Sequence, residues 1–219
     1  MSLQGRLLNM SMALRYLLAI DPSLTCSGWA LFAVDSAQIL GVGKIRSLPA
    51  SVPLAERLLD LQNKIDHILT IASIGCNDVL VCEAPTTMRD PHAAIKVEQV
   101  RGLFEVAARA RSAAVPGRIN PRSVQFEVMG LKGKQLERAV IKETAAFVVG
   151  KLHGPRLKEL GLEIDHLSLK KNQDIVDAIL IGTTALHWIS AASRGKQTLA
   201  EYFHRPATSR RRFSATRGL

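Results

Sequence analysis

An apolar run that ends in a single acid, residues 16–21, constrains the fold of this chain most. Asp21 closes the run, the turn residues Pro22 and Ser23 follow, and a second apolar run begins at Trp29 after Gly28. This pattern predicts a strand, a tight turn and a second strand. An acid at the end of a buried strand is costly to ionise unless a cation or hydrogen bonds compensate it. Alternatively, Asp21 serves only to cap the turn at Pro22.

The rest of the chain extends this start into an α/β pattern. We expect strands at residues 14–21, 27–34 and 39–46, joined by short turns as an antiparallel meander, and a buried strand at 78–82. Apolar residues at helical spacing predict helices at 54–74, 93–114, 135–150 and 172–190. A short extended segment at 118–120 and a less regular segment at 153–171 lie between them. We therefore expect a leader (1–13), one folded domain (14–192) and a basic tail (193–219).

Charge indicates the kind of partner. The 219 residues are 47% hydrophobic, which is enough for one sizeable core, and the net charge is +10. Such a charge favours a polyanionic partner, either nucleic acid or an acidic membrane surface. Residues 194–219 carry seven basic residues against Glu201 alone. A basic run of this kind is usually a solvated tail, but it also suits phosphate binding.

Cysteine content and hydropathy suggest a compartment. The three cysteines, Cys26, Cys76 and Cys82, form no CxxC pair, so we expect buried free thiols in a reducing compartment rather than disulfides or a zinc site. We expect no membrane span, because apolar runs fall short of the roughly 20 residues that a span needs. Residues 1–16 are poor in acids and weakly resemble a transit peptide, although an extended or ordered lead-in is preferred.

Four acids interrupt apolar segments in the same way. Asp21 and Glu83 each end an apolar strand, while Asp174 and Asp177 stand three residues apart at the start of an apolar helix and so share one face. Taken singly, each has an ordinary explanation: a turn cap, an acid at a strand end, or a charge pair favoured by the helix dipole. If the two strands are neighbours and the helix crosses their ends, all four carboxylates converge.

Converging carboxylates would repel one another strongly unless divalent cations lie between them. Oxygen-only ligands favour Mg²⁺ or Mn²⁺ over zinc. Two such ions about 3.5–4 Å apart would clamp the attacking and leaving oxygens of a phosphoryl displacement. A basic protein with such a site is suited to phosphodiester hydrolysis.

Four blocks of the sequence, in this order, resemble the RuvC-type Holliday junction resolvases of the RNase H-like superfamily. The first two are LLAIDPSLTCSGWALF and VLVCEAP. The third is HAAIKVEQVRGLFEVAARA, with the family's Lys and Gln-x-Arg-Gly at Lys96, Gln99, Arg101 and Gly102, and the fourth is QDIVDAILIGTTALHW. Together they span residues 16–190, and the ordered set is fairly specific.

The resemblance implies an α/β, RNase H-like fold with a five-stranded mixed sheet flanked by helices. It implies that the catalytic metal ligands are Asp21, Glu83, Asp174 and Asp177. It also implies a homodimer, for which the apolar face of the helix at 93–114 is a candidate surface. The loop at 130–134 lies where the family carries a basic junction-binding segment. The candidate DNA contacts are therefore Lys132, Lys134 and Arg138, with Arg89 and Lys96 flanking the active-site side.

The sequence also departs from the family pattern. The family often carries an aromatic residue after its Glu, whereas Glu83 is followed by Ala84-Pro85-Thr86-Thr87. The segment 151–171 is longer than the family's usual connection, and the basic tail is an addition that could contact DNA. These differences suggest a divergent branch of phage, mobile-element or organellar origin.

The expected activity is Mg²⁺-dependent resolution of four-way DNA junctions by paired symmetric nicks, with two ions per active site and Mn²⁺ able to substitute. The expected location is the cytoplasm of a bacterial or phage-infected cell, with an organellar matrix as an alternative. A related nuclease that cuts other branched DNA or an RNA–DNA hybrid is a second possibility, since the superfamily shares the metal site. A catalytically silent DNA-binding scaffold is a third, against which the presence of all four acids argues.

Overall fold

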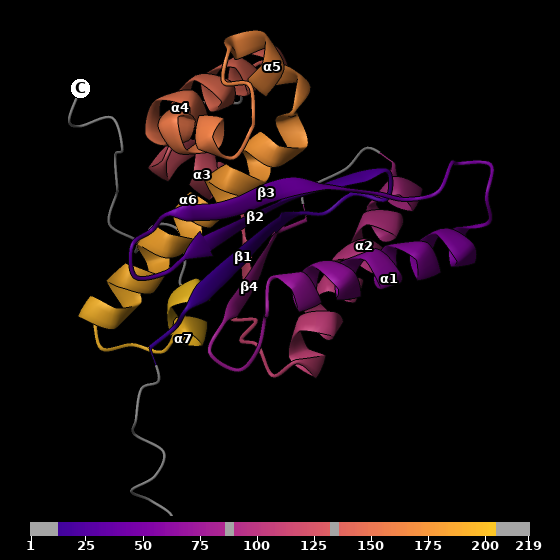
Figure 1. Cartoon of the computed structure of the whole chain (residues 1–219), viewed down its shortest axis with the longest axis horizontal. Helices are drawn as coiled ribbons and strands as arrows, with labels where there is room; N and C mark the ends of the chain where they lie inside the picture. The colour runs from indigo at the N-terminus through magenta and orange to yellow at the C-terminus, as the bar shows by residue number, and fades with distance from the viewer. Residues whose placement is uncertain (1–12, 86–89, 132–135, 205–219) are drawn as a thin grey trace, which may run out of the picture.

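A five-stranded mixed sheet forms the centre of the computed structural model, which describes residues 13–85, 90–131 and 136–204 (Figure 1). The strands lie in the order β3-β2-β1-β4-β5. The first three pair antiparallel as a meander, and β1, β4 and β5 run parallel. Their bounds are β1 Tyr16–Asp21, β2 Cys26–Ala33, β3 Ile39–Arg46, β4 Val79–Glu83 and β5 Arg118–Ile119. The predicted meander and mixed five-stranded sheet are both confirmed.

Helices cover both faces of the sheet, as Figure 1 shows. On one face α1 and α2 lie against each other, and α6 packs across β1 and β2 on the opposite face, with α3, α4 and α7 around it. The helices are α1 Leu54–Ile71, α2 Pro91–Ala110, α3 Pro121–Glu127, α4 Arg138–Glu159, α5 His166–Lys171, α6 Gln173–Arg194 and α7 Leu199–Phe203.

The central position of β1 explains its continuous apolar run. Leu17 and Ala19 pack into the cluster on the α6 face, whereas Leu18 and Ile20 pack into the cluster beneath α1 and α2. All four side chains are fully buried, because successive side chains of a strand point to opposite faces and both faces are covered. Burial on both faces therefore gives an unbroken apolar run rather than an alternating one.

The β1–β4 pairing fixes the place of the first two acids. The strands are parallel, with Ile20 opposite Cys82. Asp21 and Glu83 each follow one of these residues, so the carboxyl ends of two neighbouring strands deliver two acids to the same sheet edge.

The apolar helix α6 is the core helix of the molecule. By length and composition α6 could cross a membrane, although we expected no such segment from the sequence. However, 67% of its most apolar 18-residue stretch is buried inside the fold. Among its buried side chains are Ile179 and Trp188. The indole N–H of Trp188 donates a buried hydrogen bond of 2.7 Å to Glu127 of α3. These contacts identify α6 as a core helix that packs on the sheet.

Several predicted boundaries were wrong. The third helix was expected to end at residue 150, but α4 continues through Pro155 to Glu159. A proline inside a helix costs one hydrogen bond and a steric clash. Packing of the fully buried Leu157, together with a 2.7 Å hydrogen bond from Arg156 to the carbonyl oxygen of Ile39, offsets that cost. The segment 153–171, which we expected to be irregular, also contains helix α5 at its end.

Two further expectations need correction. Cys76 is exposed, because it lies in the turn between α1 and β4, whereas Cys82 is buried and Cys26 is intermediate; all three are free thiols. Part of the expected tail is folded, since α7 inserts Tyr202 and Phe203 against Trp188. The remainder of the expected tail, residues 205–219, lies outside the described residues, as do residues 1–12 of the expected leader.

Candidate active site

The four acids singled out from the sequence line one pocket at the carboxyl ends of β1 and β4. The pocket has a volume of about 310 Å³. Asp21 comes from β1, Glu83 from β4, and Asp174 and Asp177 from the first turns of α6. The structure therefore brings together side chains that lie up to 156 residues apart in the sequence.

Gly28 of β2 lets the start of α6 approach the sheet. A Cβ atom at this position would overlap the backbone carbonyl group of Asp174 and would lie 3.0 Å from the backbone nitrogen of Ile175. Gly28 lies opposite Asp21 in the β1–β2 register. The absence of a side chain at this position is thus what allows α6 to carry its two acids to the ends of the strands.

A buried arginine supports the end of β4. Arg101 of α2 is 2% exposed, and its Nε donates a 2.6 Å hydrogen bond to the backbone carbonyl oxygen of Glu83. Its guanidinium group also pairs with Glu98, which in turn accepts a 3.1 Å hydrogen bond from Arg118 of β5. Arg101 thus ties α2 to the strand end and brings a positive charge to the pocket wall.

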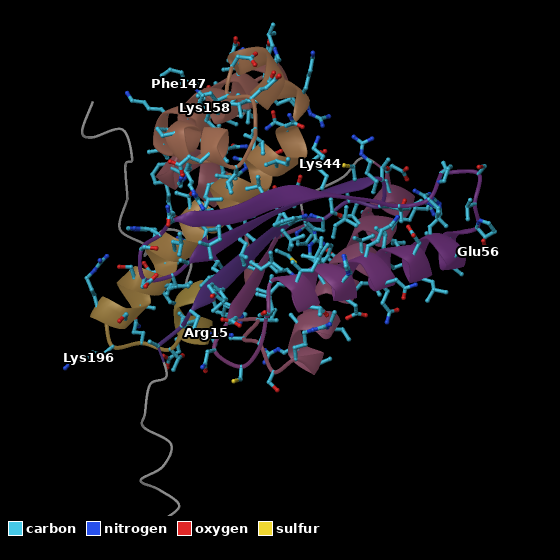
Figure 2. All side chains as sticks on the ribbon, viewed as in Figure 1. Arg15, Lys44, Glu56, Phe147, Lys158 and Lys196 are labelled. Carbon is cyan, nitrogen blue, oxygen red and sulfur yellow. The ribbon has the colours of Figure 1, made fainter. Side chains whose placement is uncertain are left out.

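The two acids of α6 are held by different partners. A carboxylate oxygen of Asp174 lies 3.4 Å from Nζ of Lys44, which extends from β3 toward the junction of α5 and α6 (Figure 2). Nε2 of Gln173 donates a 2.7 Å hydrogen bond to Oδ1 of Asp177. Asp174 therefore faces a cation of the sheet, while Asp177 is oriented by a neutral amide.

Burial and mutual repulsion make Asp21, Glu83 and Asp177 hard to ionise. Burial raises the pKa of Asp21 well above its usual range, and the charges of the other three acids raise it further. Burial and the charge of Asp177 raise the pKa of Glu83 to about 7, although Arg101 opposes the shift. Burial raises the pKa of Asp177 to about 6. The pocket thus concentrates negative charge that the protein compensates only in part.

The donor set fits a hard divalent cation. Four carboxylates offer oxygen ligands only, which suits Mg²⁺ or Mn²⁺. In the described residues, no three His, Cys, Asp or Glu side chains already enclose an ion-sized space. Asp174 contacts Lys44 and Asp177 contacts Gln173, so a bound cation would compete with these two partners for the carboxylate oxygens.

The predicted DNA contacts are only partly placed. Arg138, at the first turn of α4, lines the pocket together with Lys142 one turn later. Lys96 is exposed on α2 and is not among the residues that line the pocket. The remaining candidates, Arg89, Lys132 and Lys134, lie outside the described residues.

Sequence reasoning missed several residues of this site. Lys44, Lys142 and Gln173 were not singled out, and Arg101 entered only as part of a family motif. Lys142 follows Arg138 at i+4, a helical spacing that could have revealed it. Gln173 immediately precedes Asp174, but nothing in the local pattern shows that its amide faces Asp177.

Comparison with known proteins identifies the family of this chain. The family model described as crossover junction endodeoxyribonuclease RuvC matches residues 17–146, which is more than half of the chain. The chain belongs to the RuvC family. Within it, the crossover junction endodeoxyribonuclease RuvC of Erythrobacter litoralis is 30% identical over 121 residues, covering 53% of this chain and 70% of the relative. The RuvC of Sphingopyxis alaskensis is 27% identical over 119 residues, covering 53% of this chain and 73% of the relative.

A solved RuvC structure has the same fold. The structure of Thermus thermophilus RuvC in complex with a Holliday junction substrate aligns with a TM-score of 0.60 at 21% identity, covering 82% of this chain and 97% of that chain. The predicted α/β, RNase H-like fold is therefore confirmed. The family model ends at residue 146, so the second half of α4, α5 and the acids of α6 lie beyond its match. Membership of the RuvC family also implies a divalent metal cofactor.

Proposed function

We propose that this protein is a crossover junction endodeoxyribonuclease that hydrolyses phosphodiester bonds in four-way DNA junctions and leaves paired, symmetric nicks. One observation carries the proposal: a RuvC-family fold brings four carboxylates into a single open pocket whose wall also carries basic side chains. The fold explains where the acids lie, and the acids explain why such a pocket would need cations.

The proposed cofactor is Mg²⁺, two ions per active site, for which Mn²⁺ would substitute. When bound, such ions supply an activated water and neutralise charge on the phosphate. Asp21, Glu83, Asp174 and Asp177 would hold the ions. Asp21 and Glu83 are half-buried at the ends of β1 and β4, and the hydrogen bond from Arg101 supports the end of β4.

Basic residues of α4 would guide the DNA. Arg138 and Lys142 stand on one face of the helix and line the pocket, so they would attract a phosphate to the acids and offset its negative charge. Lys96 would contact the backbone farther from the pocket. Arg89, Lys132 and Lys134 remain proposed contacts of the same kind.

The proposed assembly is a homodimer that sets two pockets on one junction or branched DNA. The outer face of α2 supports this, since Ile95 and Val106 are 57% and 69% exposed. Large apolar side chains exposed on one helix are suited to a protein interface. We place the activity in the cytoplasm of a bacterial or phage-infected cell; an organellar matrix is the alternative.

The proposal is tested by cleavage of a labelled, mobile four-way junction with Mg²⁺ and with EDTA, beside a linear duplex of the same sequence. The expected result is paired nicks that require Mg²⁺ and spare the duplex. Asp21→Asn and Glu83→Gln should abolish cleavage and leave junction binding largely intact, whereas Asp35→Asn, which changes an exposed acid outside the pocket, should cut normally.

Other outcomes point elsewhere. Cutting of a flap or an RNA–DNA hybrid in place of the junction would keep the metal site and assign a different substrate. Tight junction binding with no cutting, even with Mn²⁺, would identify a catalytically silent scaffold. Normal cleavage by the Asp21 and Glu83 variants would refute the assignment of the active site.

A further inference from the structure

In the described part of the chain, a single buried side-chain nitrogen or oxygen atom lacks a hydrogen-bond partner. Among the buried side-chain nitrogen and oxygen atoms of those residues, only Oε1 of Gln173 makes no hydrogen bond. Folded proteins satisfy nearly all buried polar atoms, so each exception calls for a physical explanation. The residue that carries it, Gln173, lines both the carboxylate pocket and the adjoining hollow.

The orientation of the amide follows from its neighbour. The Nε2 group of Gln173 donates a 2.7 Å hydrogen bond to Oδ1 of Asp177. An ionised carboxylate can only accept hydrogen bonds, so the NH₂ group must face Asp177 and the oxygen must face away from it. Exchanging the two amide atoms would set an oxygen against a carboxylate oxygen. Oε1 is therefore held, buried and unpaired, beside the acids.

An amide oxygen in this position has the chemistry of a cation ligand. Side-chain amide oxygens coordinate hard divalent ions together with carboxylates. We propose that Gln173 is a fifth, neutral oxygen ligand of the divalent cation; this inference rests on the cation site proposed above. Its NH₂ group orients Asp177, and its Oε1 coordinates the ion.

The alternative partners of Oε1 are basic side chains. Arg138 and Lys142 line the same pocket, and either could donate to the amide oxygen after a rotamer change. In that case Gln173 would serve only the packing of α4 against α6. The two possibilities predict different effects of removing the amide. Loss of a structural hydrogen bond lowers the stability of the metal-free protein, whereas loss of a ligand lowers only the affinity for the metal.

The test is direct Mn²⁺ binding, measured without DNA by the loss of the free-ion electron paramagnetic resonance signal, together with thermal unfolding in EDTA. Gln173→Leu removes both amide functions at similar size. It should weaken Mn²⁺ binding about 10-fold or more, as removal of groups around a metal typically does. Its melting temperature in EDTA should stay within about 3 °C of wild type, since the lost bond to Asp177 is offset by removal of an unpaired buried oxygen.

Three matched variants sharpen the result. Gln173→Glu keeps an oxygen at the ligand position but loses the donor to Asp177, and it should bind Mn²⁺ at least as tightly as wild type. Asn172→Asp adds the same charge one residue away and should not reproduce that affinity. Gln125→Leu makes the same replacement in the adjoining hollow, where it should leave Mn²⁺ binding unchanged.

The outcomes separate this inference from the proposed function. Wild-type Mn²⁺ affinity in Gln173→Leu would overturn the inference. A large loss of melting temperature in EDTA would also overturn it, because it would show a structural role. Weakened binding in both Gln173→Leu and Gln173→Glu would show that Gln173 acts only through Asp177. If the wild-type protein binds no Mn²⁺, the proposed cation site itself fails.

Discussion

Gly28→Ala tests the contact that builds the carboxylate pocket. The added methyl group would overlap the backbone carbonyl group of Asp174 and approach the nitrogen of Ile175 to 3.0 Å. Both neighbours are backbone atoms, so no side chain can rotate away. Strand β2 and helix α6 would have to separate, and Asp174 would move with the helix.

The size of the effect can be worked from these contacts. Overpacking a core typically costs about 1–3 kcal/mol, and a clash with backbone belongs at the upper end. The alanine recovers only about 0.4–1 kcal/mol through the unfolded chain. We therefore expect a net loss of about 2 kcal/mol, or roughly 4–8 °C in melting temperature for a domain of this size.

Gly41→Ala in the neighbouring strand β3 is the matched control. Its Cβ would lie 3.5 Å from the ring of Trp29, an ordinary van der Waals distance. This variant should be within about 0.5 kcal/mol of wild type. Urea unfolding gives the stability difference, and repeating it with Mn²⁺ shows whether the site still binds. Gly28→Ala should also lose most of the stabilisation by Mn²⁺, because Asp174 is displaced.

Equal stability of the two glycine variants would refute this account of the β2–α6 contact. A destabilised Gly28→Ala that keeps the full stabilisation by Mn²⁺ would show that Asp174 does not need its present position.

Three further predictions follow from buried groups. Burial lowers the pKa of His153 from 6.5 to about 4, so the unfolded chain takes up a proton first as the pH falls. Glu83 and Asp177, whose pKa values are raised, titrate over the same range with the opposite sign, so the prediction concerns the difference between two proteins: from pH 6.5 to 5, wild type should lose about 1.6 kcal/mol in urea unfolding relative to His153→Gln. Asp78, fully buried, accepts bonds from two backbone N–H groups and a guanidinium, so Asp78→Asn should cost about 2 kcal/mol in urea unfolding, and a neutral result would contradict that role. Arg101→Gln removes the cation beside Glu83, so it should lower the melting temperature in EDTA and enlarge the rise in melting temperature produced by Mg²⁺. The control Arg118→Gln should not enlarge that rise. Equal rises in the two variants would refute a charge-compensating role for Arg101.

Sequence patterns predicted the parts of the fold that depend on local order. The run at 16–20 and its parallel neighbour became the sheet centre, because a strand buried on both faces must be apolar throughout. The strand predicted at 39–46 has the observed bounds. The acids stood out because each interrupts an apolar segment, and their convergence required only that β1 and β4 be neighbours.

Boundaries failed where tertiary contacts outweighed local propensity. Gly154 and Pro155 fall in the segment 153–171, which we expected to be irregular after a helix ending at residue 150, but α4 continues because Leu157 is buried and Arg156 bonds to the carbonyl oxygen of Ile39 in β3. The basic composition after residue 193 predicts a tail, but Phe203 packs edge-on against Trp188 and holds α7 to the core. Neither contact is visible in a short window of sequence.

The sequence by itself determined which acids could form the site, because their positions at the ends of apolar segments are local facts. Only the tertiary structure decided what surrounds them. Lys44 beside Asp174, Arg101 beneath Glu83, and the unpaired oxygen of Gln173 depend on contacts between elements. Periodicity shows which face of an element is buried, but the packing of one element on another sets which side chains meet. Those contacts set the charge of the pocket and the oxygen atoms that line it.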